Sequence, residues 1–125
     1  MEKEFITYEQ ALALKELGFD EYCLAFYNGK FLNSTDYNFD DGNSKDIGLC
    51  IAAPLKQQVF RWFREKYNQH SFIELVYQDG IKYDYVLYAD KDEEECDNFG
   101  DGPFNTYEEA ENACIDKLIE IAKQK

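Results

Sequence analysis

Two glycine-containing turns, each between apolar runs, constrain the fold of this chain more than any other feature. One is Asn28-Gly29, within residues 22–32, and the other is Asp79-Gly80, within residues 71–89. Glycine and asparagine tolerate the positive φ angles that tight hairpin turns need, so both segments are predicted to form β-hairpins. Because a hairpin joins antiparallel strands, two of them argue against a parallel βαβ arrangement.

Helix signals surround the two hairpins. Thr7 and Gln10 have the spacing of a capping box ahead of the apolar residues 11–17, and Gly18 supplies the end of that helix. Thr106 begins a second box ahead of a helix that reaches about Lys123. Between them, Pro54 suits the first turn of a middle helix, whose apolar residues recur at helical spacing. These residues are Leu55, Val59, Trp62, Phe63 and Tyr67, with Phe60 at the margin.

The fold predicted from these signals is α+β. Residues 47–53 form an apolar stretch that is predicted to be a further strand. Three helices are expected to pack on an antiparallel sheet built from the two hairpins and this strand. A chain of 125 residues is long enough to bury a core without disulfides or metal, so a single globular domain over residues 1–125 is expected.

The chain is acidic and is expected to be cytoplasmic. It has 26 acidic and 13 basic residues, for a net charge of −13, which opposes direct binding to nucleic acid. No apolar run has the roughly 18 residues of a membrane-spanning helix, and the first residues do not resemble a secretory signal. The four cysteines are far apart and are expected to be free thiols, buried where their context is apolar: Cys23, Cys50 and Cys114.

The charge is distributed unevenly. Residues 90–101 hold seven acids and one base, and neither a helix nor a strand is expected to cross them. The middle helix is instead basic, because Arg61 and Arg64 lie on its polar face. Lys66 falls within the apolar arc and is expected to extend its ammonium group towards water.

No catalytic or metal-binding motif is present, so we expect neither an enzyme nor a cofactor. His70 is the single histidine, and its position predicts a cation at the end of the middle helix rather than a catalytic base. Asp36, Asn38 and Asp40 have the spacing that begins a calcium loop, but Asp41 occupies the position that requires glycine. Calcium is therefore not expected either.

Several segments resemble small phage and prophage proteins of gut bacteria for which no activity is assigned. The resemblance covers the three helices, about half of the chain, and implies a setting rather than a mechanism. The segments are residues 4–21, 53–54, 60–67, 106–114 and 117–121.

Two functions remain open ahead of a third, an enzyme that uses converging carboxylates. The first is a non-catalytic protein-interaction module that binds another protein or a second copy, with Arg61 and Arg64 on its surface and aromatic side chains available to a partner. Those aromatic residues are Trp62, Tyr83, Tyr85 and Tyr88. The alternative is an acidic mimic of nucleic acid that inhibits a host enzyme through the carboxylates of Asp92, Glu93, Glu94 and Glu95.

Overall fold

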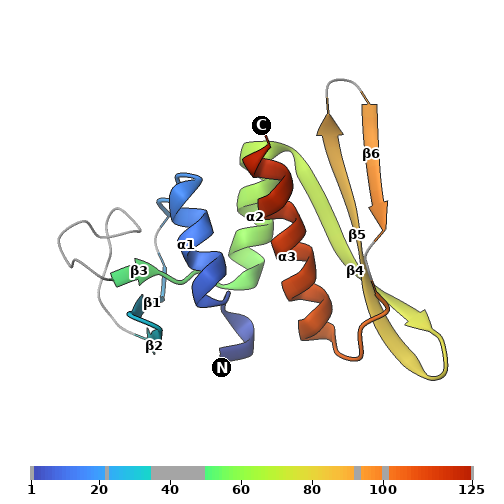
Figure 1. Ribbon diagram of the computed structural model, residues 1–125, viewed down its shortest axis with the longest axis horizontal. Coiled ribbons are helices and arrows are strands. Elements are labelled where there is room, and N and C mark those ends of the chain that lie inside the picture. The colour runs from blue at the N-terminus through green and yellow to red at the C-terminus, as the bar shows by residue number, and fades with distance from the viewer. Residues whose placement is uncertain (1, 22, 35–49, 92–93, 100–101, 125) are drawn as a thin grey trace. The chain divides into compact units, whose positions relative to one another are not determined.

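The α+β class is confirmed in a computed structural model of the chain (Figure 1). The part of the chain that the structure describes has three α-helices and six antiparallel strands, which form two three-stranded sheets rather than one. The chain divides into two compact units, Met1–Gln58 and Val59–Lys125, which are described separately below. The single domain expected over the whole chain stays a prediction. The structure describes residues 2–21, 23–34, 50–91, 94–99 and 102–124.

The first unit contains a short 3-10 helix, one α-helix and one sheet. Its elements are η1 (Glu2–Glu4), α1 (Tyr8–Glu16), β1 (Ala25–Asn28), β2 (Phe31–Ser34) and β3 (Cys50–Ala52). The capping box is confirmed: Thr7 Oγ1 accepts from the Gln10 amide at 3.2 Å, and Gln10 Oε1 accepts from the Thr7 amide at 2.9 Å. Gly18 follows the helix with φ 93°, as expected of a glycine at this position.

The sheet of the first unit contains the first predicted hairpin and the predicted further strand. β1 pairs with both neighbours, in the order β2-β1-β3. The turn lies one residue later than expected, because Asn28 pairs with Phe31 and Gly29 takes the first central position with φ 61°. Tyr27 fixes the sheet to the segment before α1, since its hydroxyl donates to the Ile6 carbonyl at 2.6 Å and its ring meets Tyr8 edge to face.

The second unit contains the second predicted hairpin and the helix α3 (Tyr107–Lys123). The hairpin consists of β4 (Gln69–Tyr77) and β5 (Ile81–Lys91), and Asp79 and Gly80 in its turn have φ 52° and 111°. Helix α3 packs against both strands. Its residues Ala110, Cys114, Leu118 and Ile121 are buried, and so are Tyr85 and Leu87 of β5.

The acidic segment contains a strand that the sequence did not predict. β6 (Glu94–Phe99) pairs with β5 and completes the sheet order β4-β5-β6. The prediction of a segment without strands was wrong because strand pairing uses backbone groups, and an edge strand can carry charged residues that remain hydrated. In this register Lys91 pairs with Glu94.

The middle helix α2 (Lys56–Tyr67) ends where the sequence placed it, but His70 does not cap it. Asn68 adopts φ 55° and ends the helix, and the chain then enters β4 at Gln69. His70 is an exposed residue of β4 whose Nε2 lies 2.9 Å from Asn68 Oδ1. Asparagine tolerates the left-handed conformation, so the helix can end at Asn68 without a histidine cap.

Gln69 is the least expected residue of the second unit's interior. Its side chain is fully buried, and neither Nε2 nor Oε1 has a hydrogen-bond partner among the described residues. Burying an amide without partners costs roughly 1–3 kcal/mol.

We therefore expect Gln69→Met to raise the free energy of unfolding by about 1–2 kcal/mol, because the thioether fills a similar volume without an unsatisfied polar group. Urea denaturation followed by far-ultraviolet circular dichroism measures the change. Gln10→Met is the matched control: it removes a satisfied buried amide and should destabilise the chain by about 1 kcal/mol. A destabilised Gln69→Met variant would contradict this account.

Candidate interaction surface

The exposed face of α2 carries the basic residues that the sequence singled out. Arg61 and Arg64 are exposed, whereas Val59, Phe60 and Phe63 on the opposite face are buried. Lys66 is exposed as predicted, and its Nζ lies 5.0 Å from the centre of the Trp62 ring and 5.7 Å from that of Tyr67. A cation at this distance is attracted to the face of an aromatic ring.

The predicted acidic surface is only partly within the described residues. Asp92 and Glu93 lie outside them, as do Asp36, Asn38 and Asp40 of the calcium-like pattern. Glu94 and Glu95 are the first residues of β6, opposite Lys91 and Asp90. The two predicted surfaces therefore belong to different elements, α2 and the edge of the second sheet.

The aromatic residues expected to be available to a partner are mostly not available. Trp62 and Tyr85 are buried, and Tyr83 is half-buried with its ring 5.7 Å from that of Tyr107. Tyr88 is the exception, at 43% exposed. This expectation failed because alternation along a strand identifies which residues share a face but not which face a helix covers.

A different set of apolar side chains is exposed at the loop end of the β4–β5 hairpin. Leu75, Tyr77 and Ile81 are 64%, 82% and 59% exposed. The register pairs Leu75 with Tyr83 and Tyr77 with Ile81, so these residues share the face of the sheet that α3 covers. The helix begins only at Tyr107, beside Tyr83, and the hairpin continues past it (Figure 1). We call Leu75, Tyr77 and Ile81 the hairpin-tip cluster.

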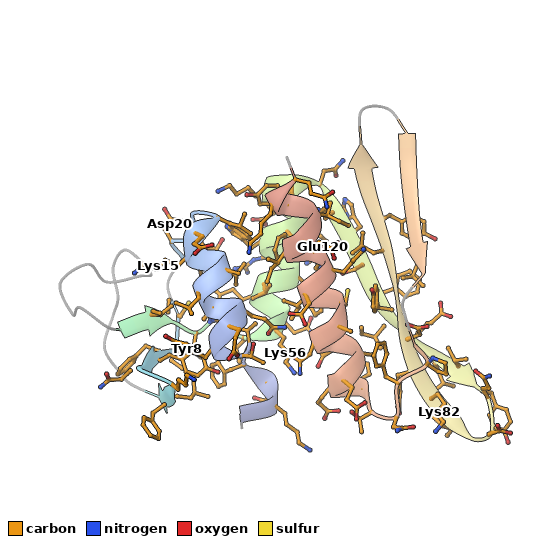
Figure 2. The ribbon with its side chains drawn as sticks, in the orientation of Figure 1. Tyr8, Lys15, Asp20, Lys56, Lys82 and Glu120 are labelled. Carbon is orange, nitrogen blue, oxygen red and sulfur yellow. The ribbon has the colours of Figure 1, made fainter. Side chains whose placement is uncertain are left out.

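The base of this hairpin end is held in place by the segment before α3. Phe104 and Tyr83 exchange two backbone hydrogen bonds, at 2.6 Å and 2.9 Å. Lys82, labelled near the loop end of the hairpin in Figure 2, donates to Asn105 Oδ1 at 2.6 Å. The hairpin-tip cluster is thus carried on a strand pair that is braced just behind it.

The opposite face of the hairpin combines apolar and charged residues. His70, Phe72 and Glu74 share this face, opposite Tyr88, Val86 and Asp84 respectively. Phe72 is 51% exposed, and Val86 beside it is buried. The sequence could have shown both faces through the alternation in β4, but the point at which α3 stops covering one of them depends on tertiary packing.

Two cysteines are confirmed as buried free thiols, Cys23 and Cys114. Burial raises the pKa of Cys23 to about 12, and the charge of Glu21 acts in the same direction. Burial also raises the pKa of Cys114 to about 12; a hydrogen bond with Ser71 opposes this effect and the charge of Glu111 adds to it. Since a thiolate is the reactive form, neither residue has the environment of a nucleophile.

No set of three or more histidine, cysteine or acidic residues is placed to hold a metal ion in the described part of the chain. Among the same residues, no helix combines the length and the apolar character needed to cross a membrane. No protein-family model matches the chain, and comparisons with curated proteins and with solved structures find no match.

We expect Cys23 and Cys114 to resist alkylation in the folded chain at pH 8 to 9 and to react once urea unfolds it, because their thiols stay protonated when buried. Peptide mapping by mass spectrometry separates them from the other cysteines. Alkylation of either thiol at the unfolded rate under native conditions would contradict the assignment.

The same shifts set a pH dependence of stability. Both folded-state pKa values lie above the ordinary value of 9.0, so the stabilisation is present below pH 9 and is lost as the pH rises towards 12. The free energy of unfolding should fall over this range, and it should fall less in the Cys114→Ala variant than in the wild-type chain. Urea denaturation of both chains at each pH measures the difference.

Proposed function

We propose that this chain is a non-catalytic protein-interaction module and that the hairpin-tip cluster is its main contact surface. The observation that carries the proposal is that three large apolar side chains, Leu75, Tyr77 and Ile81, each more than half exposed, share one face of a braced hairpin. Contiguous exposed apolar surface of this kind is typical of binding sites.

Physical considerations support this surface. Complete burial of a side chain of this size is worth roughly 1.5–3 kcal/mol, so a partner that covers the cluster gains a substantial part of the affinity of a specific complex. The hydrogen bonds of Phe104 and Asn105 hold the hairpin base, which reduces the ordering cost of binding. A cytoplasmic location and a phage or prophage origin belong to the same proposal.

The net charge of −13 limits which partners can bind the chain. Repulsion disfavours an acidic surface and direct contact with nucleic acid phosphates, so the partner of the cluster should be apolar at its centre and neutral or basic around it. Arg61 and Arg64 are the exception on this chain, and they would favour an acidic partner on α2.

Affinity capture from a bacterial lysate compares the two surfaces. We expect the triple variant Leu75→Ser, Tyr77→Ser, Ile81→Ser to lose the proteins that the wild-type chain retains, because it removes the apolar contact area. Arg61→Glu with Arg64→Glu should retain them. Mass spectrometry with isotope labelling quantifies the bound proteins.

Two results would overturn this assignment: equal retention by the wild-type chain and the triple variant, or loss only from the arginine variant, which would move the surface to α2. The three substituted residues are exposed, so the thermal unfolding of the triple variant should stay close to that of the wild-type chain and serves as the folding control.

The acidic mimic is a second candidate, favoured by the strand β6. Part of the acidic segment follows the regular strand repeat, with about 3.3 Å per residue, instead of an irregular loop. Evenly spaced acids are what a protein needs if it is to resemble a row of phosphates, and Glu95 and Asp97 lie two residues apart on this strand.

For this candidate, we expect the wild-type chain to bind a host nuclease or polymerase at physiological salt and the variant Asp92→Asn, Glu93→Gln, Glu94→Gln, Glu95→Gln to lose binding by about tenfold or more. A matched control neutralises four exposed acids on helices: Glu9, Glu16, Asp116 and Glu120. Equal losses in the two variants, measured by surface plasmon resonance, would indicate an effect of net charge and reject a specific mimic.

A further inference from the structure

Strand β4 lies at one edge of the second sheet and has few of the features that prevent an edge strand from pairing with another chain. Among the described residues, β5 is the only strand that pairs with it. Its nine residues include neither proline nor glycine, and Glu74 is their single acid. Proline, bulges and charge are the usual protection of an edge strand. The opposite edge, β6, has three acids in six residues, so β4 is the edge suited to a further strand.

One face of β4 has a pattern that is complementary to itself. His70, Phe72 and Glu74 follow one another on this face, with the apolar residue between the base and the acid. Glu74 stands directly opposite Asp84 of β5, and like charges in this position destabilise a sheet. Asp84 Oδ1 accepts a hydrogen bond from the Tyr85 amide at 2.8 Å, whereas the described residues show no salt bridge between Glu74 and a basic side chain.

We propose that the β4 edge binds the β4 edge of a second copy of this chain, antiparallel, with the two-fold axis at Phe72. This proposal rests on the proposed interaction function and names one partner. In this register Phe72 lies opposite Phe72 of the second copy. His70 lies opposite Glu74 of the second copy, and the symmetry makes the same pair twice. The two sheets become one six-stranded sheet.

The register brings together an exposed aromatic ring and exposed or half-buried polar side chains. Phe72 is 51% exposed, and pairing across the axis covers it and continues the apolar row that begins at Val86. His70 Nε2 contacts Asn68 Oδ1 within the chain, and in this register the rest of the exposed imidazole faces the Glu74 carboxylate of the second copy, which separates that carboxylate from other acids across the new edge. Both terms stabilise the dimer and neither is available to a single copy.

Neighbouring registers lack this complementarity. An axis at Ile73 places Phe72 opposite Glu74, and an axis at Ser71 places Phe72 opposite His70. An axis at Glu74 puts two carboxylates face to face. The pattern of apolar and charged residues therefore selects the axis at Phe72. Since both copies carry a charge of −13, added salt should strengthen the dimer, which is opposite to a complex held by attraction between net charges.

A charge exchange tests the register. Sedimentation velocity over a concentration series should show the wild-type chain, 14.7 kDa, in equilibrium with a dimer. His70→Glu should raise the dissociation constant at least about tenfold, because it sets two acids opposite each other. Adding Glu74→Lys to that variant should restore dimerisation, since the acid introduced by His70→Glu then faces a lysine of the second copy instead of an acid.

Gln78→Glu is the matched control for the added charge, because it adds the same charge in the loop outside the paired residues and should leave the dissociation constant within about threefold of wild type. A wild-type chain that stays monomeric throughout the series would overturn the proposal. A double variant that associates no better than His70→Glu would overturn the register.

Cysteine cross-linking tests the axis directly and does not depend on charge. Phe72→Cys should form an intermolecular disulfide under mild oxidation, because residues at the axis have Cα atoms about 4.5–5.5 Å apart. Leu75→Cys is exposed to a similar extent but would lie about 20 Å from its counterpart, and it should not cross-link more than the wild-type chain. Equal cross-linking of the two variants would contradict the axis.

The proposed dimer and the proposed interaction function can be rejected independently of each other. The charge-exchange variants leave the hairpin-tip cluster on the other face unchanged. Loss of self-association with unchanged capture of other proteins would therefore reject the second copy as partner and keep the proposed function. Dimerisation that persists in the triple hairpin-tip variant, together with unchanged capture, would reject the cluster and keep the β4 edge.

Discussion

The register between β4 and β5 is the constraint on which the second unit depends. Tyr77 pairs with Ile81 across the Asp79-Gly80 turn, and every later pair follows from that one. Side chains alternate between faces, so a slip of one residue would move Tyr85 and Leu87 from the buried face to the opposite one. The same slip would separate Phe72 from Val86. The turn thus sets both the core of this unit and the surfaces that it presents.

Local signals in the sequence identified most elements because their physical causes are local. A threonine with a glutamine three residues later satisfies the first amides of a helix wherever the helix lies, and α1 begins with this arrangement. A glycine with positive φ closes a hairpin for the same kind of reason, as Gly80 does. The first turn differed by one residue, since Gly29 with Lys30 is also a favourable pair for a two-residue loop.

The features missed by sequence reasoning depend on contacts between distant segments. β6 exists because β5 offers it a free edge, and the run of acids in residues 90–101 gave no sign of that edge. The prediction that Trp62 and Tyr85 are available for binding was wrong because large aromatic side chains are highly buried on average, as both are here. The exposure of the hairpin-tip cluster was not predicted, because how much of the sheet face α3 covers depends on where the helix begins relative to Tyr83.

The two edge strands of the second sheet differ in their acid content, and this difference relates the charge of the chain to its proposed association. The sequence of β6 has three acids in six residues, and charge on an edge strand disfavours pairing with another acidic chain there without affecting the other edge. β4 has a single acid, and in the proposed register His70 and Glu74, on either side of Phe72, lie opposite each other. A strongly acidic chain can therefore remain dispersed and still recognise a partner, since repulsion acts over the whole molecule while pairing needs only one complementary edge.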